Sequence, residues 1–372
     1  MRRSVDLTPG QRVALAAGTA TLLASAVLIV AAPQPVPALV QFFLKPFSSR
    51  LAFGTMLQGA VPLMIAGIGV LLAFKSSNFN LGGEGQIYAG ALAACVTGLA
   101  LQYTTAPLVA VLASIAAGMV TGALLASISG LLKAMRGVSE MISSFLLSAA
   151  VVLLADALLT GPLQDPSSNF QTTSMLSRAL LLPRLLPPSR LDLAFPFALV
   201  LIGATRYLAR TSRIGFELAI CGTNEAFARY CGIPVEVYMV GTMAVSGALH
   251  GLAGALLVLG PYGRVMRGFS AGTGWSAISV ALLAQGSEAG ILPAALFFAW
   301  LKAGSDQVMI GSGIPSEFIA ILQAAAMFLV TASSLPIMRR HRKIPASGVE
   351  TPAAPQEPDS TGQTSSEPGV RP

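Results

Sequence analysis

The chain has 372 residues, of which 54% are hydrophobic and 10% are charged, and its formal net charge at pH 7 is +7. Because soluble domains carry about 25% charged residues, this composition excludes an ordinary water-soluble protein and indicates a surface covered by membrane lipid. The basic residues stand at the ends of apolar blocks, without interleaved aromatic residues. This pattern does not indicate a nucleic-acid partner and is typical of membrane topology, in which lysine and arginine collect on cytoplasmic loops.

The apolar residues fall into ten blocks, most of them close to the length of about 20 residues that crosses a hydrocarbon core about 30 Å thick. Since no water is available there to satisfy backbone groups, each block is predicted to be a helix. The predicted fold class is all-α, a polytopic transmembrane helical bundle of about ten spans. The predicted spans are 13–32, 51–74, 84–101, 107–132, 138–160, 193–209, 238–259, 270–284, 290–304 and 317–335.

The distribution of basic residues predicts that both termini are cytoplasmic. Residues 1–12 are expected to form a cytoplasmic N-terminus, 13–338 the transmembrane domain, and 339–372 a disordered cytoplasmic tail. Two connections are long, an outer loop at 161–192 and a cytoplasmic loop at 210–237.

The stretch 270–304 decides on which side the C-terminus lies. A break at 285–290 gives two short segments and keeps the basic cluster 339–343 in the cytoplasm, which is the arrangement we expect. A re-entrant hairpin at this place is the alternative.

Two glycine-rich breaks precede membrane segments from opposite sides. Residues 80–85 precede the third span on its cytoplasmic side, and residues 268–274 precede the eighth span on its outer side. Such paired, glycine-interrupted segments are typical of an inverted repeat, although a chain with 37 glycines also gives such matches by chance. Residues 118–122 and 247–251 add a GxxxG pattern to the fourth and seventh spans.

A short helix is predicted at residues 223–230 of the cytoplasmic loop. Thr223 or Asn224 can cap its start, Glu225 suits the positive end of the helix dipole, and Gly232 can end it. An isolated helix of this length is marginal in water. We therefore expect it to dock, either under the bundle of this protein or in a groove of a partner ATPase.

The same loop resembles that of ABC permeases of the branched-chain amino acid and ribose permease family, in which the segment reads much like GENPEAARYAGI. Residues 224–226, 228–230 and 232–233 match this pattern. The positions that depart from it are Thr223, Phe227 and Cys231.

Three further stretches match the family in the same order. They are residues 79–86 (FNLGGEGQ), 137–143 (GVSEMIS, with Ser139 where the family usually has Asn) and 277–283 (AISVALL). The matches span roughly residues 50–330 and are most like the branch that serves nucleosides or simple sugars.

The resemblance implies an all-helical permease that works with a second permease subunit, as a homo- or heterodimer, with a cytoplasmic ABC ATPase and with an extracytoplasmic substrate-binding lipoprotein. It implies that the cytoplasmic loop couples to the ATPase. The candidate coupling residues are Asn224, Glu225, Arg229, Tyr230 and Gly232.

Polar and aromatic residues near the two glycine-rich breaks are the candidates for the substrate pathway. They are Asn80, Glu84, Gln86, Phe269, Trp275 and Ser276. Their hydrogen-bonding and stacking groups suit an uncharged substrate with a ring and hydroxyls. Glu84 begins a helix, so capping is an equal alternative for it, and a tryptophan near the interface is often a belt residue.

The predicted function is the membrane-spanning permease subunit of an ABC importer in the inner membrane, moving a nucleoside or simple sugar. The sequence has no Gly-Lys pair and hence no P-loop, so we expect ATP and magnesium to bind to a partner ATPase and no cofactor or metal to bind here. The alternatives are an ion-coupled secondary transporter and a membrane-embedded enzyme. The enzyme reading lacks a partner for the one membrane histidine, His250.

Overall fold

The computed structural model describes residues 32–312, a few scattered residues before them, and residue 324. The described helices are α2 (Pro35–Phe43), α3 (Arg50–Lys75), α4 (Gly83–Leu101), α5 (Pro107–Arg136), α6 (Glu140–Leu159), α7 (Ala194–Thr211), α8 (Arg213–Thr223), α9 (Glu225–Tyr230), α10 (Val235–Leu257), α11 (Thr273–Leu283) and α12 (Glu288–Ser312). Short 3-10 turns at Lys45–Phe47 and Arg178–Leu180 and a π-helical turn at Val258–Tyr262 complete them. Within these residues the all-α prediction is confirmed, since β-pairing is limited to two isolated bridges.

The eight predicted spans between residues 51 and 304 each correspond to one helix. Their bounds agree within a few residues, except that α12 continues to Ser312, eight residues beyond the predicted end. Four described helices are long and apolar enough to cross a membrane: α3, α5, α6 and α10 with its π-helical turn. The predicted last span and the tail 339–372 lie outside the described residues apart from residue 324, as does most of the predicted first span.

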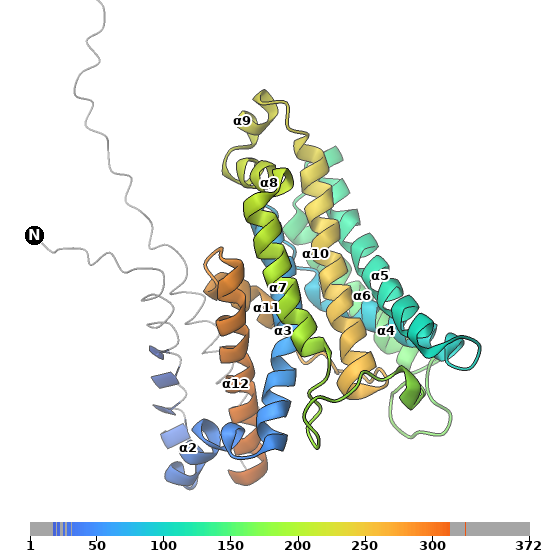
Figure 1. The fold of residues 1–372 in the computed structure, drawn as a ribbon, viewed down its shortest axis with the longest axis vertical. Helices are drawn as coiled ribbons and strands as arrows, with labels where there is room; N and C mark the ends of the chain where they lie inside the picture. Colours follow the sequence, from blue (N-terminus) through green and yellow to red (C-terminus); the bar gives the residue numbers. More distant parts are fainter. Residues whose placement is uncertain are drawn as a thin grey trace, which may run out of the picture. The chain divides into compact units, whose positions relative to one another are not determined.

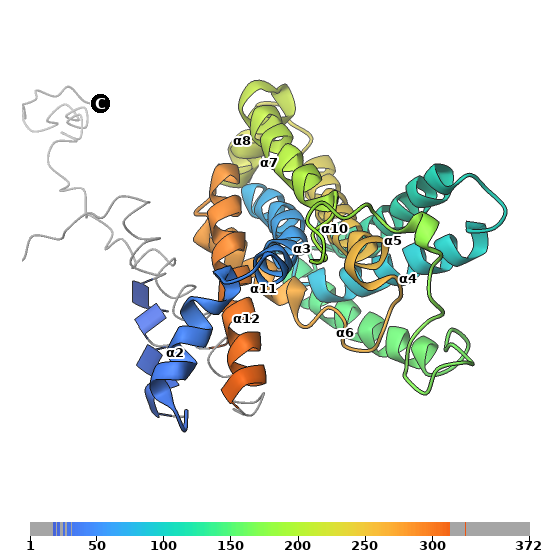
Figure 2. The same ribbon diagram turned by 60° about the horizontal axis from the view of Figure 1, so that its bottom comes forward.

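Helices α3 and α10 form the centre of the bundle. Figures 1 and 2 show them side by side, with α12 on the α3 side and α5 on the α10 side. Both central helices are apolar over most of their circumference and largely buried. Helices α5 and α6 instead turn large apolar side chains outward, such as Leu124 and Leu153. A helix that is hydrophobic all round suits a buried or membrane position, so this division separates a core from a lipid-facing or partner-facing layer.

Glycines bring α5 and α10 into close contact. A Cβ atom on Gly251 would lie 2.1 Å from the carbonyl oxygen of Gly118, and one on Gly247 would lie 2.2 Å from that of Gly122. Small residues at such crossings let membrane helices approach closely. The two GxxxG patterns of the sequence therefore pack against each other.

The break expected within 270–304 is present. Helix α11 ends at Leu283 and α12 begins at Glu288, and between them Gln285 and Gly286 have φ angles of 51° and 78°. With 11 residues, α11 is only about 16 Å long. It is too short to cross the hydrocarbon core alone.

The predicted cytoplasmic loop 210–237 holds two helices where one was predicted. Helix α8 was missed, and Ser212 caps it by accepting a hydrogen bond from the Gly215 amide at 3.1 Å. In Figure 1, α8 and α9 lie at the top of the view, at the opposite end of the bundle from α2.

Candidate functional site

The segment between α3 and α4 is non-helical and lies buried in the bundle with its polar side chains paired. Ser76 Oγ lies 2.7 Å from Thr242 Oγ1, and the Asn80 amide donates to Ser246 Oγ at 2.9 Å. Thr242 and Ser246 are one turn apart on α10. Irregular backbone at membrane depth is tolerated only where protein or a water-filled cavity surrounds it, and here one edge of the segment is held by α10.

The other edge of this segment is held by α6. The amides of Leu81 and Gly85 donate to the hydroxyls of Ser144 and Ser148, at 3.1 and 2.7 Å. These two serines are also one helical turn apart. The main chain leading into α4 is thus tied to two helices at once.

A largely buried ion pair anchors the same segment at its predicted cytoplasmic end. Lys133 Nζ lies 2.9 Å from Glu140 Oε1 and donates to Asn78 Oδ1 at 2.8 Å. Glu140 also accepts from the Phe79 amide at 3.2 Å. Its charge is therefore compensated by a lysine and by a backbone donor.

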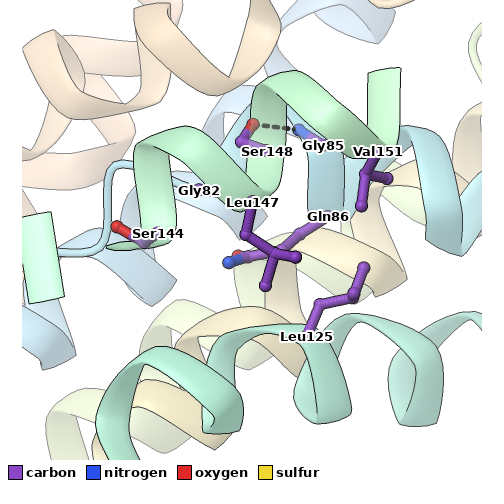
Figure 3. A pocket seen from close by; sticks show the side chains of 8 residues that line it. All are labelled: Gly82, Gly85, Gln86, Leu125, Ser144, Leu147, Ser148 and Val151. Atoms are coloured by element: carbon purple, nitrogen blue, oxygen red, sulfur yellow. Dashed lines mark hydrogen bonds between the residues drawn. The ribbon is translucent and has the colours of Figure 1, made fainter. Parts of the chain in front are cut away.

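Asn80 and Gln86, two pathway candidates, are hydrogen-bonded to each other. Asn80 donates to Gln86 Oε1 at 2.9 Å, and Gln86 donates to Asn80 Oδ1 at 3.0 Å. Figure 3 shows Gln86 beside a cavity between α4, α5 and α6, with the Ser148–Gly85 hydrogen bond at its edge. This cavity holds about 10 Å³, the space of a single water. The structure places both amides in a packed layer.

Glu84 joins the start of α4 to the start of α11. Its carboxylate accepts from the backbone amides of Gly272 (3.2 Å) and Gly274 (2.8 Å) and from the Ser270 hydroxyl. The two helices meet so closely that a Cβ on Gly274 would lie 2.3 Å from the Glu84 nitrogen. A carboxylate between two helix N-termini is favoured by both dipoles. Glu84 is therefore a capping group, and it caps a helix nearly 200 residues away.

Phe269 and Ser276 line a cavity of about 150 Å³ beside this junction. The Phe269 ring makes edge-on contacts with Tyr88 and Tyr262, at centroid distances of 4.9 and 6.1 Å. Trp275 does not line this cavity. It is 36% exposed and packs edge-on against Phe145 at 5.9 Å.

The capping residues of α9 lie as predicted. Asn224 Oδ1 accepts from the Phe227 amide at 3.0 Å, which makes Asn224 the N-cap, and Thr223 belongs to α8. Glu225 is the first residue of the helix, and Gly232 has a φ of 74°, a left-handed conformation that favours glycine.

The remaining coupling candidates are on the surface. Arg229 forms an ion pair with Glu236, and Tyr230 is 89% exposed. Phe216 and Phe227 are also exposed. The helix pair therefore presents aromatic side chains that the described bundle does not cover.

Helix α8 rests on the C-terminal end of α3 and on α10. A Cβ on Gly222 would lie 2.0 Å from the Lys75 carbonyl oxygen, and Ser77 Oγ donates to the Gly222 carbonyl at 2.8 Å. Glu217 accepts from the Tyr238 hydroxyl at 2.6 Å, and this hydrogen bond, together with Arg213, lowers the pKa of the Glu217 carboxyl. The helix pair thus contacts the polar segment that leads to Glu84.

Sequence reasoning missed the hydroxyls and the lysine that hold the polar segment: Lys133, Ser144, Ser148, Thr242 and Ser246. Their spacing of four residues on otherwise apolar helices was the available signal, because it places them on one face. No cluster of three or more His, Cys, Asp or Glu that could hold a metal occurs in the part of the chain that the structure describes.

A profile of the family described as branched-chain amino acid transport system / permease component matches residues 52–331. The chain belongs to this family. Among curated relatives of this permease, a probable riboflavin import permease of Treponema pallidum is 34% identical, covering 83% of this chain and 81% of the relative.

Two further relatives of the permease are similar over most of their length. A glucose ABC transporter permease of Haloferax volcanii is 34% identical over 86% of this chain and 85% of its own. A guanosine ABC transporter permease of Bacillus subtilis is 31% identical over 75% of this chain and 81% of its own. The chain is therefore a multi-pass membrane permease subunit of an ABC importer, a transporter component and not an enzyme, and its family works with ATPase and substrate-binding partners.

Proposed function

We propose that this permease imports a nucleoside, or a simple sugar, across the inner (plasma) membrane, with both termini in the cytoplasm. It works beside a second permease subunit and surrounding lipid, it receives substrate from an extracytoplasmic lipoprotein, and it is driven by an ATPase that binds ATP and magnesium. The relatives named for guanosine, glucose and riboflavin support this substrate range, since each of those solutes carries a ring and several hydroxyls.

The observation that carries the proposal is the helix pair α8–α9 at the predicted cytoplasmic end. Its capped second helix exposes Phe227 and Tyr230, as a helix that fits a groove of a partner would. Its first helix rests on the end of α3 through Gly222. An ATPase bound there would act on the bundle through a direct backbone contact.

Three glutamates of the described bundle give no support to the alternative of an ion-coupled carrier. Glu140 and Glu288 each form an ion pair with a lysine, and Glu84 caps α11. Carboxylates that are compensated in this way are not free to bind a coupling ion.

The test is co-purification from detergent of the tagged chain, followed by identification of what accompanies it. We expect a stoichiometric P-loop ATPase with the natural sequence, and its loss together with substrate uptake in Glu225→Arg and Gly232→Pro, at unchanged expression and membrane insertion. Proline cannot adopt the positive φ of Gly232.

Gly222→Ala and Gly203→Ala form a matched pair for the same assay. The first places a methyl group against the Lys75 carbonyl, and the second points into open space. We expect reduced uptake only for Gly222→Ala. Normal uptake in Glu225→Arg and Gly232→Pro, or a chain that purifies alone under conditions that preserve known complexes, would contradict the proposal and favour a gradient-driven carrier.

A further inference from the structure

Helix α12 carries two ionisable residues near the predicted outer end of its membrane span. Lys302 Nζ and Asp306 Oδ2 are 3.9 Å apart, and their side chains are 53% and 48% exposed. From Glu288, which pairs with Lys75 at the cytoplasmic end, Lys302 lies about 21 Å along the helix. Ionisable side chains inside a membrane segment are costly and normally face a water-filled cavity that serves function.

Such a cavity is present beside them. It has a volume of about 890 Å³ and lies between the first half of α3, the preceding 3-10 turn, the π-helical turn and α12. Its polar and charged lining includes Lys45, Gln58, Arg190, Lys302, Asp306 and Gln307. Lys45 and Arg190 belong to segments at the predicted outer end, and the volume is in the range of small-molecule sites.

This outer cavity continues into the smaller cavity beside the α4–α11 junction. The two share the lining residues Gly59, Leu257, Tyr262 and Lys302. The smaller cavity adds the rings of Phe269 and Phe298 and the hydroxyl-bearing residues Ser270, Thr273 and Ser276. Its floor is the loop that Glu84 holds in place.

We propose that the two cavities form one solute chamber inside a single permease chain, which binds a planar ring bearing carbonyl oxygens and a polyhydroxylated substituent. The rings of Tyr262, Phe269 and Phe298 enclose the planar part, where stacked or edge-on contacts are favourable. The Lys302 ammonium donates to a ring carbonyl, and the serine and threonine side chains bind the hydroxyls. This assignment rests on the proposed import function and adds that a planar ring is preferred over a simple sugar.

The first test measures ATP-driven uptake of guanosine, riboflavin and D-glucose by the complete importer in proteoliposomes. We expect Lys302→Met to raise the KM of the imported planar solute about tenfold or more, the effect of losing a hydrogen bond to a charged group, and Lys302→Arg to restore part of it. Phe298→Ala should act in the same direction. The controls are Arg178→Met and Tyr103→Ala, two exposed residues outside both cavities.

The second test measures binding without transport. Lys302→Cys should react with a membrane-impermeant thiol reagent added from outside, and guanosine or riboflavin should protect it. Ile310→Cys, on an exposed face of the same helix, should react without protection. Of the natural cysteines, Cys95 and Cys221 are buried, and Cys231 lies in the predicted cytoplasmic loop.

The outcomes separate the two proposals. Import by the natural sequence without protection at position 302 and with an unchanged KM in Lys302→Met overturns the chamber alone. Protection of the cysteine at position 302 in a chain that imports none of the three probes supports the chamber and overturns the proposed substrate range. Import of glucose only, with protection by glucose only, overturns the preference for a planar ring.

Discussion

Glu84 shows how one side chain can serve two distant helices. It lies at the beginning of α4, yet the backbone amides that donate hydrogen bonds to it belong to the start of α11. The sequence indicated that Glu84 begins a helix, and it left capping and a place in the substrate pathway as equal alternatives. Which helix it caps could not be predicted, because that depends on the crossing of segments 190 residues apart.

We expect Glu84→Gln to destabilise the folded permease by about 1–3 kcal/mol, because hydrogen bonds to a charged acceptor are stronger than those to an amide. Thermal unfolding in detergent measures the loss, and uptake should fall with it. Asp165→Asn, in the predicted outer loop, is the control and should leave the unfolding temperature unchanged. An unchanged unfolding temperature for Glu84→Gln would show that the charge contributes nothing at this junction.

Asp192 is a buried carboxyl just before α7 whose partners are uncharged. It is 1% exposed, accepts from the Ala194 amide at 2.8 Å and from the Gln58 side chain at 3.0 Å. Burial raises its pKa from 3.8 to about 6, against the opposing effect of these hydrogen bonds. The folded protein therefore holds this proton more tightly than the unfolded chain does.

For an acid whose folded pKa is raised, stability falls as the pH rises from about 4 to about 6 and stays lower above that range. We expect the unfolding temperature to drop between about pH 5 and about pH 7.5, by an amount equivalent to at most about 2 kcal/mol. In Asp192→Asn this drop should be smaller, whereas Asp165→Asn should retain it. Equal drops in both variants would assign the pH dependence to other groups.

At the scale of elements, the sequence predicted those helices whose bounds are marked by local features, such as capping residues or apolar runs. Helix α9 follows from Asn224 as its cap and Gly232 as its end, and the span lengths follow from apolar runs. Helix α8 was missed because its sequence, with Gly215 and Gly222, has weak helix propensity. What holds it is tertiary, namely the contacts of Gly222 with the end of α3 and of Glu217 with α10.

For the candidate pathway residues, too, the sequence predicted local position but not tertiary contacts. The sequence predicted their position near the two glycine-rich breaks. Of these candidates, only Phe269 and Ser276 line the cavity of about 150 Å³. The amides of Asn80 and Gln86 pair with each other. A sequence reveals polar groups at membrane depth, whereas it does not reveal which of them already have protein partners.

The α5–α10 crossing gives a prediction at this scale. Gly251→Ala places a methyl group 2.1 Å from the Gly118 carbonyl, and overpacking of this kind costs about 1–3 kcal/mol. Gly241→Ala, on the same helix but facing open space, should be neutral or slightly stabilising. The measurement is the thermal unfolding temperature of the two variants. Equal stabilities would mean that α5 and α10 can move apart without loss of stability.

At the scale of the whole molecule, the distribution of charge predicts the orientation in the membrane. Cys231 is exposed in the predicted cytoplasmic loop, so a membrane-impermeant thiol reagent should label it in inside-out vesicles and not in intact cells. Phe170→Cys, in the predicted outer loop where Phe170 is 73% exposed, should show the reverse when it is combined with Cys231→Ser. The opposite pattern would invert the topology predicted for both loops.

The polar segment between α3 and α4 also connects the helix pair α8–α9 to the start of α11. Ser77 touches α8, and Glu84, seven residues later, holds the floor of the proposed chamber. Between them the backbone is short, non-helical and fastened to α6 and α10, so it has little slack. Suppose that a bound ATPase displaces α8 and that Ser77 moves with it. The displacement is then either absorbed within these few peptide units or passed to the start of α11. The backbone of this segment would then transmit the displacement, while the side chains that hydrogen-bond to it hold it in position.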